Sequence, residues 1–281
     1  MACKIQFFFQ CGEDVLTIGD NQYGIVDYSD LESPEYDYDT EKRLSGYGST
    51  IRSRRISERE ITITAEYKSR REGKEEAREF VTRFFRPYTS GNLTVRRGTL
   101  ERNIDYEISE FRSKNTNIYD RFRFQLTLLC PDPALLSEKR TGDITTWVNG
   151  LRFPFKLPFS LRRHGDTYTI IENKGDLETP VLIRFYGPAL NPVIQNVSTG
   201  EHVKVRCSLK DGEILEINTD YGAKSVILRR GGESENLNQV LDLSSRFFWL
   251  QLGENVMSYK SDNTAQKNKV TVSYHERYLG I

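Results

Sequence analysis

The stretch Pro180–Arg229 constrains the fold most strongly, because short apolar runs alternate there with turn residues at close intervals. Two of these runs are Val181–Tyr186 and Val193–Val197, and each ends at a turn sequence containing glycine. In the next run polar residues separate the apolar ones, which are Val203, Val205, Cys207 and Leu209. Short apolar runs bounded by Gly, Pro, Ser and Asn are typical of β-strands.

Two further turns complete this pattern. Asp211-Gly212 is a strong hairpin signal, because both central residues of a two-residue hairpin turn need φ > 0. The chain then continues through Glu213–Asn218, turns at Asp220–Gly222 and ends with Ser225–Arg229. We therefore expect five strands and four turns that form one antiparallel β-unit.

The order of these turns resembles a known family. The pattern NP-I-N--TGE begins at Asn191, and after the Asp-Gly turn EI-T--G-KSV begins at Glu216. RYLG follows at Arg277–Gly280, and a mid-chain CPDP lies at Cys130–Pro133. Their order and spacing resemble the distal tail protein (Dit) family, which comprises structural tail-tip components of phages with long non-contractile tails.

The resemblance implies a mainly β fold with two β-sandwich domains. The first would be a tail-tube-like sandwich with one amphipathic helix, and the second would be galectin-like or jelly-roll-like. The first domains would close a hexameric ring that joins the tail tube to the tail-tip hub and baseplate. The second would stand around that ring and carry receptor-binding proteins. DNA would pass through the ring without specific binding, and the protein would be a virion component.

Length and charge agree with a folded two-domain protein. The chain has 281 residues, long enough for two hydrophobic cores. Basic and acidic residues number 40 each, so the excess positive charge typical of nucleic-acid binding is absent. No apolar run approaches the length of a membrane span, and the N-terminal segment is a poor signal peptide. We expect assembly in the host cytoplasm and no membrane partner.

The first half carries strand patterns and one helix. Ile5–Phe9, Gly24–Val26, Ile61–Tyr67, Leu93–Val95, Ile104–Ile108 and Phe122–Leu128 are expected strands. The expected helix is Lys74–Arg86, where Ala77, Phe80, Val81, Phe84 and Phe85 form one apolar face. Glu79 and Arg83 have the spacing of a favourable helical ion pair.

Between the first strands lie two blocks of opposite charge. The acidic block contains Asp27, Asp30, Glu32, Glu35, Asp37, Asp39 and Glu41. It lacks the glycine and bidentate glutamate of an EF-hand, so we expect a solvated loop rather than a cation site. The basic block contains Lys42, Arg43, Arg52, Arg54, Arg55 and Arg59 around SGYGST, and its composition predicts a long loop. The two blocks either form a contact between subunits or are simply solvated.

A junction divides the chain into expected domains at 1–138 and 139–281. Cys130–Pro133 and Ser137–Asp143 supply the proline, glycine and charge of a domain boundary. Beyond it, Leu151–Leu161 alternates strictly and contains Pro154 and Pro158, which confines it to a sheet edge. Further strands are expected at Phe247–Leu252, Val256–Tyr259 and Val270–Tyr274.

The search for chemistry gives no candidate catalytic, cofactor-binding or metal-binding residue. His164, His202 and His275 show no metal spacing and no nucleophile motif. Cys3, Cys11, Cys130 and Cys207 are scattered, which favours buried thiols over a disulfide or zinc site. We expect a structural protein that is not an enzyme.

Two other functions remain open. The first is a monomeric glycan-binding, lectin-like module that stacks tryptophans and tyrosines on sugars. Trp147 is the better placed tryptophan for that role, because Trp249 lies in the apolar run Phe247–Leu250, which is typical of a buried strand. A β-rich hydrolase has support only from the fold class.

Overall fold

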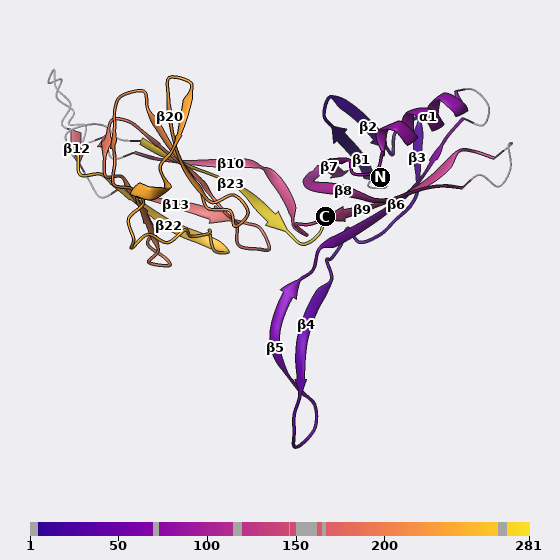
Figure 1. The fold of residues 1–281 in the computed structure, drawn as a ribbon, viewed down its shortest axis with the longest axis horizontal. Coiled ribbons are helices and arrows are strands. Elements are labelled where there is room, and N and C mark those ends of the chain that lie inside the picture. Colours follow the sequence, from indigo (N-terminus) through magenta and orange to yellow (C-terminus); the bar gives the residue numbers. More distant parts are fainter. Residues whose placement is uncertain are drawn as a thin grey trace, which may run out of the picture. The chain divides into compact units, whose positions relative to one another are not determined.

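A computed structural model describes residues 5–69, 73–114, 120–145, 147–149, 162–164, 167–263 and 269–281. The chain divides into two compact units (Figure 1). The first contains Met1–Glu138 together with Tyr278–Ile281, and the second contains Lys139–Arg277. The last four residues thus belong to the first unit, although the sequence placed them in the second domain.

The first unit is a β-sandwich with one helix. Its elements are β1 (Ile5–Cys11), β2 (Asp14–Ile18), β3 (Tyr23–Tyr28), β4 (Tyr36–Lys42), β5 (Ser49–Ile56), β6 (Arg59–Tyr67), α1 (Lys74–Phe84), β7 (Ser90–Arg97), β8 (Leu100–Lys114), β9 (Arg123–Cys130) and the start of β10 (Leu135–Thr145). Antiparallel pairing gives the order β2-β1-β7-β8-β9-β6-β3. β8 pairs with β7 through its first half and with β9 through its second, so this one long strand belongs to both layers of the sandwich.

The expected strands and helix of this unit are confirmed, with longer bounds for most strands. β2 is an additional strand whose five residues gave too short a pattern to recognise. The apolar face of α1 packs into the core, where Ala77, Val81 and Phe84 are buried. Phe85 follows the helix and packs edge-on against Phe9, with ring centroids 5.2 Å apart. The helical ion pair that forms joins Glu75 to Arg78, at 3.4 Å, rather than Glu79 to Arg83.

The opposite charge blocks form a structure that the sequence analysis predicted wrongly. Instead of two loops, the chain forms an antiparallel hairpin of β4 and β5, which projects from the sandwich of the first unit (Figure 1). Alternating tyrosine and acid in β4 fits a strand as well as a polar loop does, and only the pairing with β5 decides between them. We call this hairpin the arm.

The second unit is also a two-layered β-sandwich. Its elements are the rest of β10, β11 (Trp147–Asn149), β12 (Arg162–His164), β13 (Thr167–Asn173), β14 (Leu182–Tyr186), β15 (Ala189–Leu190), β16 (Val193–Asn196), β17 (His202–Lys204), β18 (Ser208–Leu209), β19 (Ile214–Asn218), β20 (Ser225–Arg230), β21 (Glu233–Asn236), a 3-10 turn (Asn238–Val240), β22 (Gly253–Lys260) and β23 (Lys269–Tyr278). One layer has the order β10-β23-β14-β19-β20-β21 and the other β13-β22-β16-β17. Buried residues from both layers, including Phe185, Leu215, Ile194 and Met257, form its core.

The β-rich stretch Pro180–Arg229 therefore contributes to both layers instead of forming one sheet. The hairpin at Asp220–Gly222 is confirmed, because β19 pairs with β20. The hairpin at Asp211-Gly212 is wrong: β18 pairs with β15 while β19 pairs with β14 and β20. Of the two turn residues only Gly212 has positive φ, at 81°, so this is not the predicted two-residue hairpin turn. The turn instead connects β18, which pairs with β15, to β19 in the larger layer.

One further expectation fails in this part of the chain. The expected strand Phe247–Leu252 is irregular apart from a bridge between Leu250 and Thr179. Ser137–Asp143, where the two units divide, is part of β10, and the Thr141 and Ser273 hydroxyls lie 3.1 Å apart there. The proline-containing segment Leu151–Leu161 lies outside the described residues.

Candidate functional site

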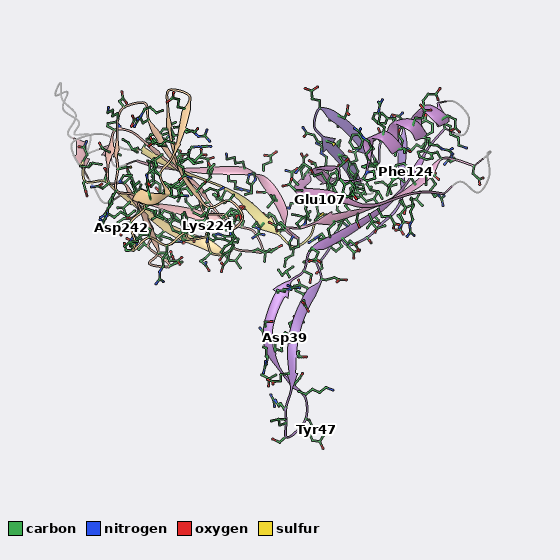
Figure 2. The ribbon with its side chains drawn as sticks, viewed as in Figure 1. Asp39, Tyr47, Glu107, Phe124, Lys224 and Asp242 are labelled. Carbon is green, nitrogen blue, oxygen red and sulfur yellow. The ribbon has the colours of Figure 1, made fainter. Side chains whose placement is uncertain are left out.

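The arm is the feature of the first unit that packing within the chain does not explain. Seven residue pairs hold it together, from Tyr36 opposite Ile56 to Lys42 opposite Ser49. The register shifts between Asp39 and Thr40, so Arg52 is an extra residue of β5. Figure 2 shows Asp39 midway along the arm and Tyr47 at its tip. A two-stranded hairpin without further packing is marginally stable in water, so a covering surface would stabilise it.

One face of the arm carries charges that pair with each other. Arg55 Nε lies 3.2 Å from Asp37 Oδ2, and Arg52 Nε donates to Glu41 Oε2 at 2.8 Å. All four side chains are more than half exposed. Such exposed pairs contribute only about 0–1 kcal/mol each, but they leave fewer unpaired charges on this face.

The other face is partly apolar and is uncovered. Residues directly opposite in a hairpin share a face, so this face carries Tyr36, Tyr38, Ile51 and Ile56 together with Arg54, which lies opposite Tyr38. Tyr38 is 52% exposed and Ile51 is 44% exposed. Neither belongs to a hydrophobic cluster of the described residues. Exposed apolar side chains gathered on one face in this way are typical of a protein interface.

The root of the arm is fixed to the sandwich by a buried arginine. Arg59 is only 1% exposed, and its Nη1 donates to the backbone carbonyls of Asp30 and Leu31. Its Nη2 donates to the carbonyl of Leu279, near the end of the chain. Burial lowers the pKa of Arg59, and the nearby Cys130 and Asp30 oppose that shift. The arm therefore projects from a well-ordered base.

The side chain of His202, in the part of the chain that the structure describes, lies beside groups that could do chemistry. His202 Nε2 lies 3.1 Å from Ser244 Oγ, and Ser244 Oγ donates to Asp242 Oδ1 at 2.7 Å. Because the single hydroxyl proton of Ser244 points at Asp242, His202 must donate to Ser244 and cannot act as its base. Hydrogen bonds from the hydroxyl and the backbone N–H of Ser244, with one from Arg206, hold the pKa of Asp242 well below its usual range. This cluster ties a turn together and is not a catalytic triad.

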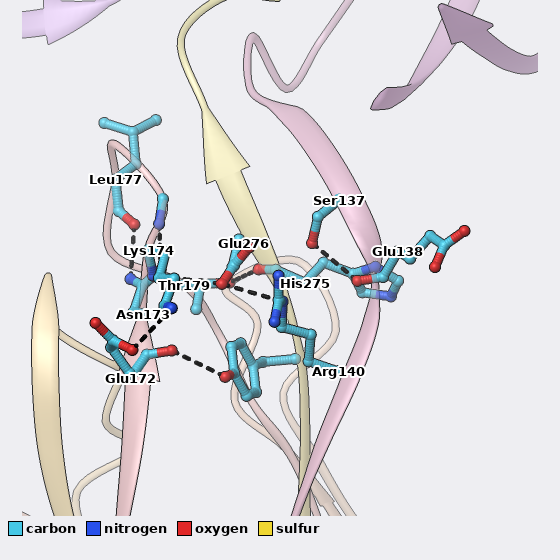
Figure 3. Close-up of polar contacts among 12 residues, drawn as sticks. Ser137, Glu138, Arg140, Glu172, Asn173, Lys174, Leu177, Thr179, His275 and Glu276 are labelled. Carbon is cyan, nitrogen blue, oxygen red and sulfur yellow. Dashed lines mark hydrogen bonds and ion pairs between the residues drawn. The ribbon is translucent and has the colours of Figure 1, made fainter. Parts of the chain in front are cut away.

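The polar cluster around Glu276 is likewise structural (Figure 3). Glu276 is 1% exposed and pairs with Arg140 at 3.0 Å, while the backbone N–H of Lys174 donates to it at 3.4 Å. Thr179 donates to the backbone carbonyl of His275, and Tyr274 donates to that of Glu172. Sequence reasoning missed this cluster, because no spacing relates Arg140 to Glu276.

The remaining candidates gave no site. No group of His, Cys, Asp or Glu among the described residues has the arrangement of a metal site. A cavity of about 530 Å³ between α1 and the β2–β3 segment contains Asp20, but that carboxylate accepts the backbone N–H groups of Gln22 and Tyr23. The side chains of Cys3, Trp147 and His164 lie outside the described set. Trp249, expected to be buried, is only partly so.

Comparisons with known proteins agree with the fold. Residues 174–278 match the family model of the siphovirus-type tail component, C-terminal domain. The crystal structure of SPP1 Dit, described as a paradigm of the hub adsorption apparatus in phages that infect Gram-positive bacteria, is similar, with a TM-score of 0.71 and 14% identity. The alignment covers 97% of this chain and 99% of that one.

Two structures of the phage P2 baseplate in its activated conformation also match. The structure with Ca has 13% sequence identity, and the alignment covers 97% of this chain and 98% of that chain. The structure with Sr has 12% sequence identity, and the alignment covers 96% of this chain and 97% of that chain. Both have TM-scores of 0.53. No curated protein matches, and no helix among the described residues is long and apolar enough to cross a membrane. The family model thus matches the C-terminal part of the chain, residues 174–278, and nearly the whole chain shares the fold of the SPP1 Dit structure.

Proposed function

We propose that this protein is a phage tail component that forms a hexameric ring hub, which joins the tail tube to the tail tip and baseplate. Its first unit forms the ring and its second unit carries neighbouring proteins such as receptor-binding proteins. The matched hub and baseplate structures support this role. DNA passes through the ring without specific binding, in agreement with the equal numbers of acidic and basic residues.

The observation that carries this proposal is the group of exposed apolar side chains, Tyr36, Tyr38 and Ile51, on the uncovered face of the arm. Six copies in a closed ring give every arm an equivalent neighbour, so each Tyr38 and Ile51 is covered and growth stops at closure. An arm that projects from a fixed root can reach a neighbouring copy without rearrangement of the sandwich. The tyrosine and isoleucine side chains then contribute the apolar part of the contact, with Arg54 opposite Tyr38.

In this proposal the two charge blocks do not form the contact between subunits. The sequence left open a contact in which the acidic block of one copy meets the basic block of the next. In the structure, Asp37 pairs with Arg55 and Glu41 with Arg52 inside the same arm. The charged face then keeps the arm soluble before assembly, and the apolar face makes the contact.

The proposed role is structural rather than catalytic. Asp242 and Ser244 hold a turn, Glu276 is paired with Arg140, and Asp20 accepts backbone hydrogen bonds. Each of these polar groups is already engaged in holding the fold. The function that the geometry supports is assembly within the virion.

Native mass spectrometry and negative-stain microscopy of the full chain test the proposal. We expect closed rings of six copies for the wild-type chain. Tyr38→Ser combined with Ile51→Ser should yield monomers, whereas Asp37→Asn combined with Glu41→Gln on the opposite face should retain the ring. A wild-type chain that stays monomeric at all concentrations, or rings that tolerate the Tyr38 and Ile51 changes, would contradict it.

A further inference from the structure

The second unit presents an exposed aromatic surface that the assembly role does not explain. It consists of Tyr221, Phe247 and Trp249 with Lys224 and Arg277, and we call it the aromatic surface. Tyr221 lies in the turn between β19 and β20 and is 75% exposed. Its ring centroid lies 4.8 Å from that of Trp249, and the two planes meet at 50°. The two rings therefore form an open angle rather than a closed stack.

Trp249 is held in place from two sides. Its indole N–H donates to the backbone carbonyl of Thr219 at 3.0 Å. The guanidinium of Arg277 lies 5.3 Å from its ring centroid, and Arg277 also donates to the carbonyl of Glu178. An aromatic ring fixed in this way loses little conformational entropy when a ligand stacks against it.

Lys224 supplies a cation beside the rings. Its Nζ lies 4.4 Å from the centroid of Tyr221 and 5.7 Å from that of Phe247 (Lys224 is labelled in Figure 2). Among the described residues Lys224 forms no salt bridge, unlike Arg184, Arg229 and Arg230 on the neighbouring strands. An ammonium group with only aromatic contacts can still bind an anion.

We propose that the aromatic surface binds an acidic saccharide, a sugar chain carrying carboxylate or phosphate groups. The apolar C–H face of a pyranose ring would lie against Tyr221 and the exposed part of Trp249. The acidic group would form a charge-assisted hydrogen bond with Lys224. This assignment differs from the one favoured by the sequence, which placed sugar stacking at Trp147.

Tryptophan fluorescence gives a direct readout. The chain has two tryptophans, so Trp147→Phe leaves Trp249 as the only indole. This variant would be titrated with a galacturonic acid trimer, a neutral galactose trimer and a phosphorylated trisaccharide. We expect saturable changes with one or both acidic trimers and at least tenfold weaker binding of the neutral one. The acidic trimer that binds more tightly identifies the acidic group.

Variants separate binding from folding. In the Trp147→Phe background, Tyr221→Ala should weaken binding of the acidic trimer at least tenfold, and Lys224→Gln should reduce the preference for acidic over neutral sugar. Tyr168→Ala, which removes another exposed tyrosine of the same unit, should change neither. No response to any trimer in the millimolar range, or an unchanged response in Tyr221→Ala, would overturn the proposal. Equal binding of the neutral trimer would overturn its acidic part.

Discussion

Asp37 and Arg55 lie opposite each other in the arm, and their side chains pair across it at 3.2 Å. These residues come from the two blocks of opposite charge that the sequence displays as separate stretches. Their pairing turns the blocks into the two strands of one hairpin. It also places the tyrosines that alternate with the acids on the opposite, uncovered face.

The ring should therefore resist salt. Exposed ion pairs contribute little and are screened further at high ionic strength, whereas burial of apolar surface is not weakened by salt. We expect the same ring population from about 0.05 M to about 1 M NaCl, over which the Debye length falls severalfold. Size-exclusion chromatography with light scattering measures this. Dissociation into monomers at the higher concentration would show that charge pairing between copies holds the ring.

Removing the guanidinium of Arg59 should destabilise the first unit. Arg59→Met leaves the carbonyls of Asp30, Leu31 and Leu279 without their donor. A buried acceptor without a partner costs about 1–3 kcal/mol, so we expect a loss of that order in the free energy of unfolding. Arg52→Met in the exposed arm is the matched control and should change stability by under about 1 kcal/mol. Chemical denaturation followed by circular dichroism compares the two, and equal effects would refute the role of Arg59.

The variant Gly280→Ala, which adds one methyl group, should destabilise the first unit near Glu32. A Cβ at Gly280 would lie 2.2 Å from the backbone oxygen of Glu32, which cannot move aside like a flexible side chain. Overpacking of this kind costs about 1–3 kcal/mol. Gly222→Ala provides the control, because nothing lies within 4 Å of its Cβ and its φ is not positive. Thermal unfolding should show a lower midpoint for Gly280→Ala alone, and an unchanged midpoint would contradict the tight contact.

Acid should weaken the second unit partly through Glu216. Burial acts to raise the pKa of Glu216, but hydrogen bonds from Arg229 and Arg184 outweigh it, so the pKa lies below its usual value of 4.5. A carboxyl whose pKa is lower in the folded state stabilises the protein above the unfolded value. That contribution is lost as pH falls through the folded value.

Glu216→Gln tests this relation. The variant should lose stability near neutral pH and lose less than the wild type does when pH falls below about 4.5, where the unfolded carboxyl is half protonated. Denaturant titrations at a series of pH values give the slopes. Parallel curves for the two proteins would show that Glu216 is not linked to acid unfolding.

The sequence predicted elements best where a repeating pattern reflects burial. The apolar face of α1 and the alternation in Phe122–Leu128 lie in the core as expected. Prediction from the sequence failed where the structure of a segment depends on which strand pairs with it. Tyr36–Lys42 looks like a polar loop until Ser49–Ile56 pairs with it, and the composition of Ser137–Asp143 gives no sign of the strand that pairs with β23.

Contacts between residues distant in the sequence also limit the prediction of sites. A hairpin at Asp211-Gly212 was expected from local turn chemistry, but the strands before and after that turn pair with other strands. Tyr221 and Trp249 are separated by 28 positions, and no spacing rule brings them together. Trp249 was expected to be buried because its neighbours are apolar, yet only Phe248 and Leu250 of that run are buried.

Residues 278–281 have a consequence for the order of folding. Tyr278 lies under the guanidinium of Arg102, Leu279 accepts from Arg59, and Ile281 accepts from Arg97. The contacts to Leu279 and Ile281 join residues 220 and 184 positions apart, because the second unit lies between them in the sequence. Closing a loop of that length costs conformational entropy, so such contacts form late in folding. The root of the arm is therefore fixed only after the intervening second unit has been synthesised.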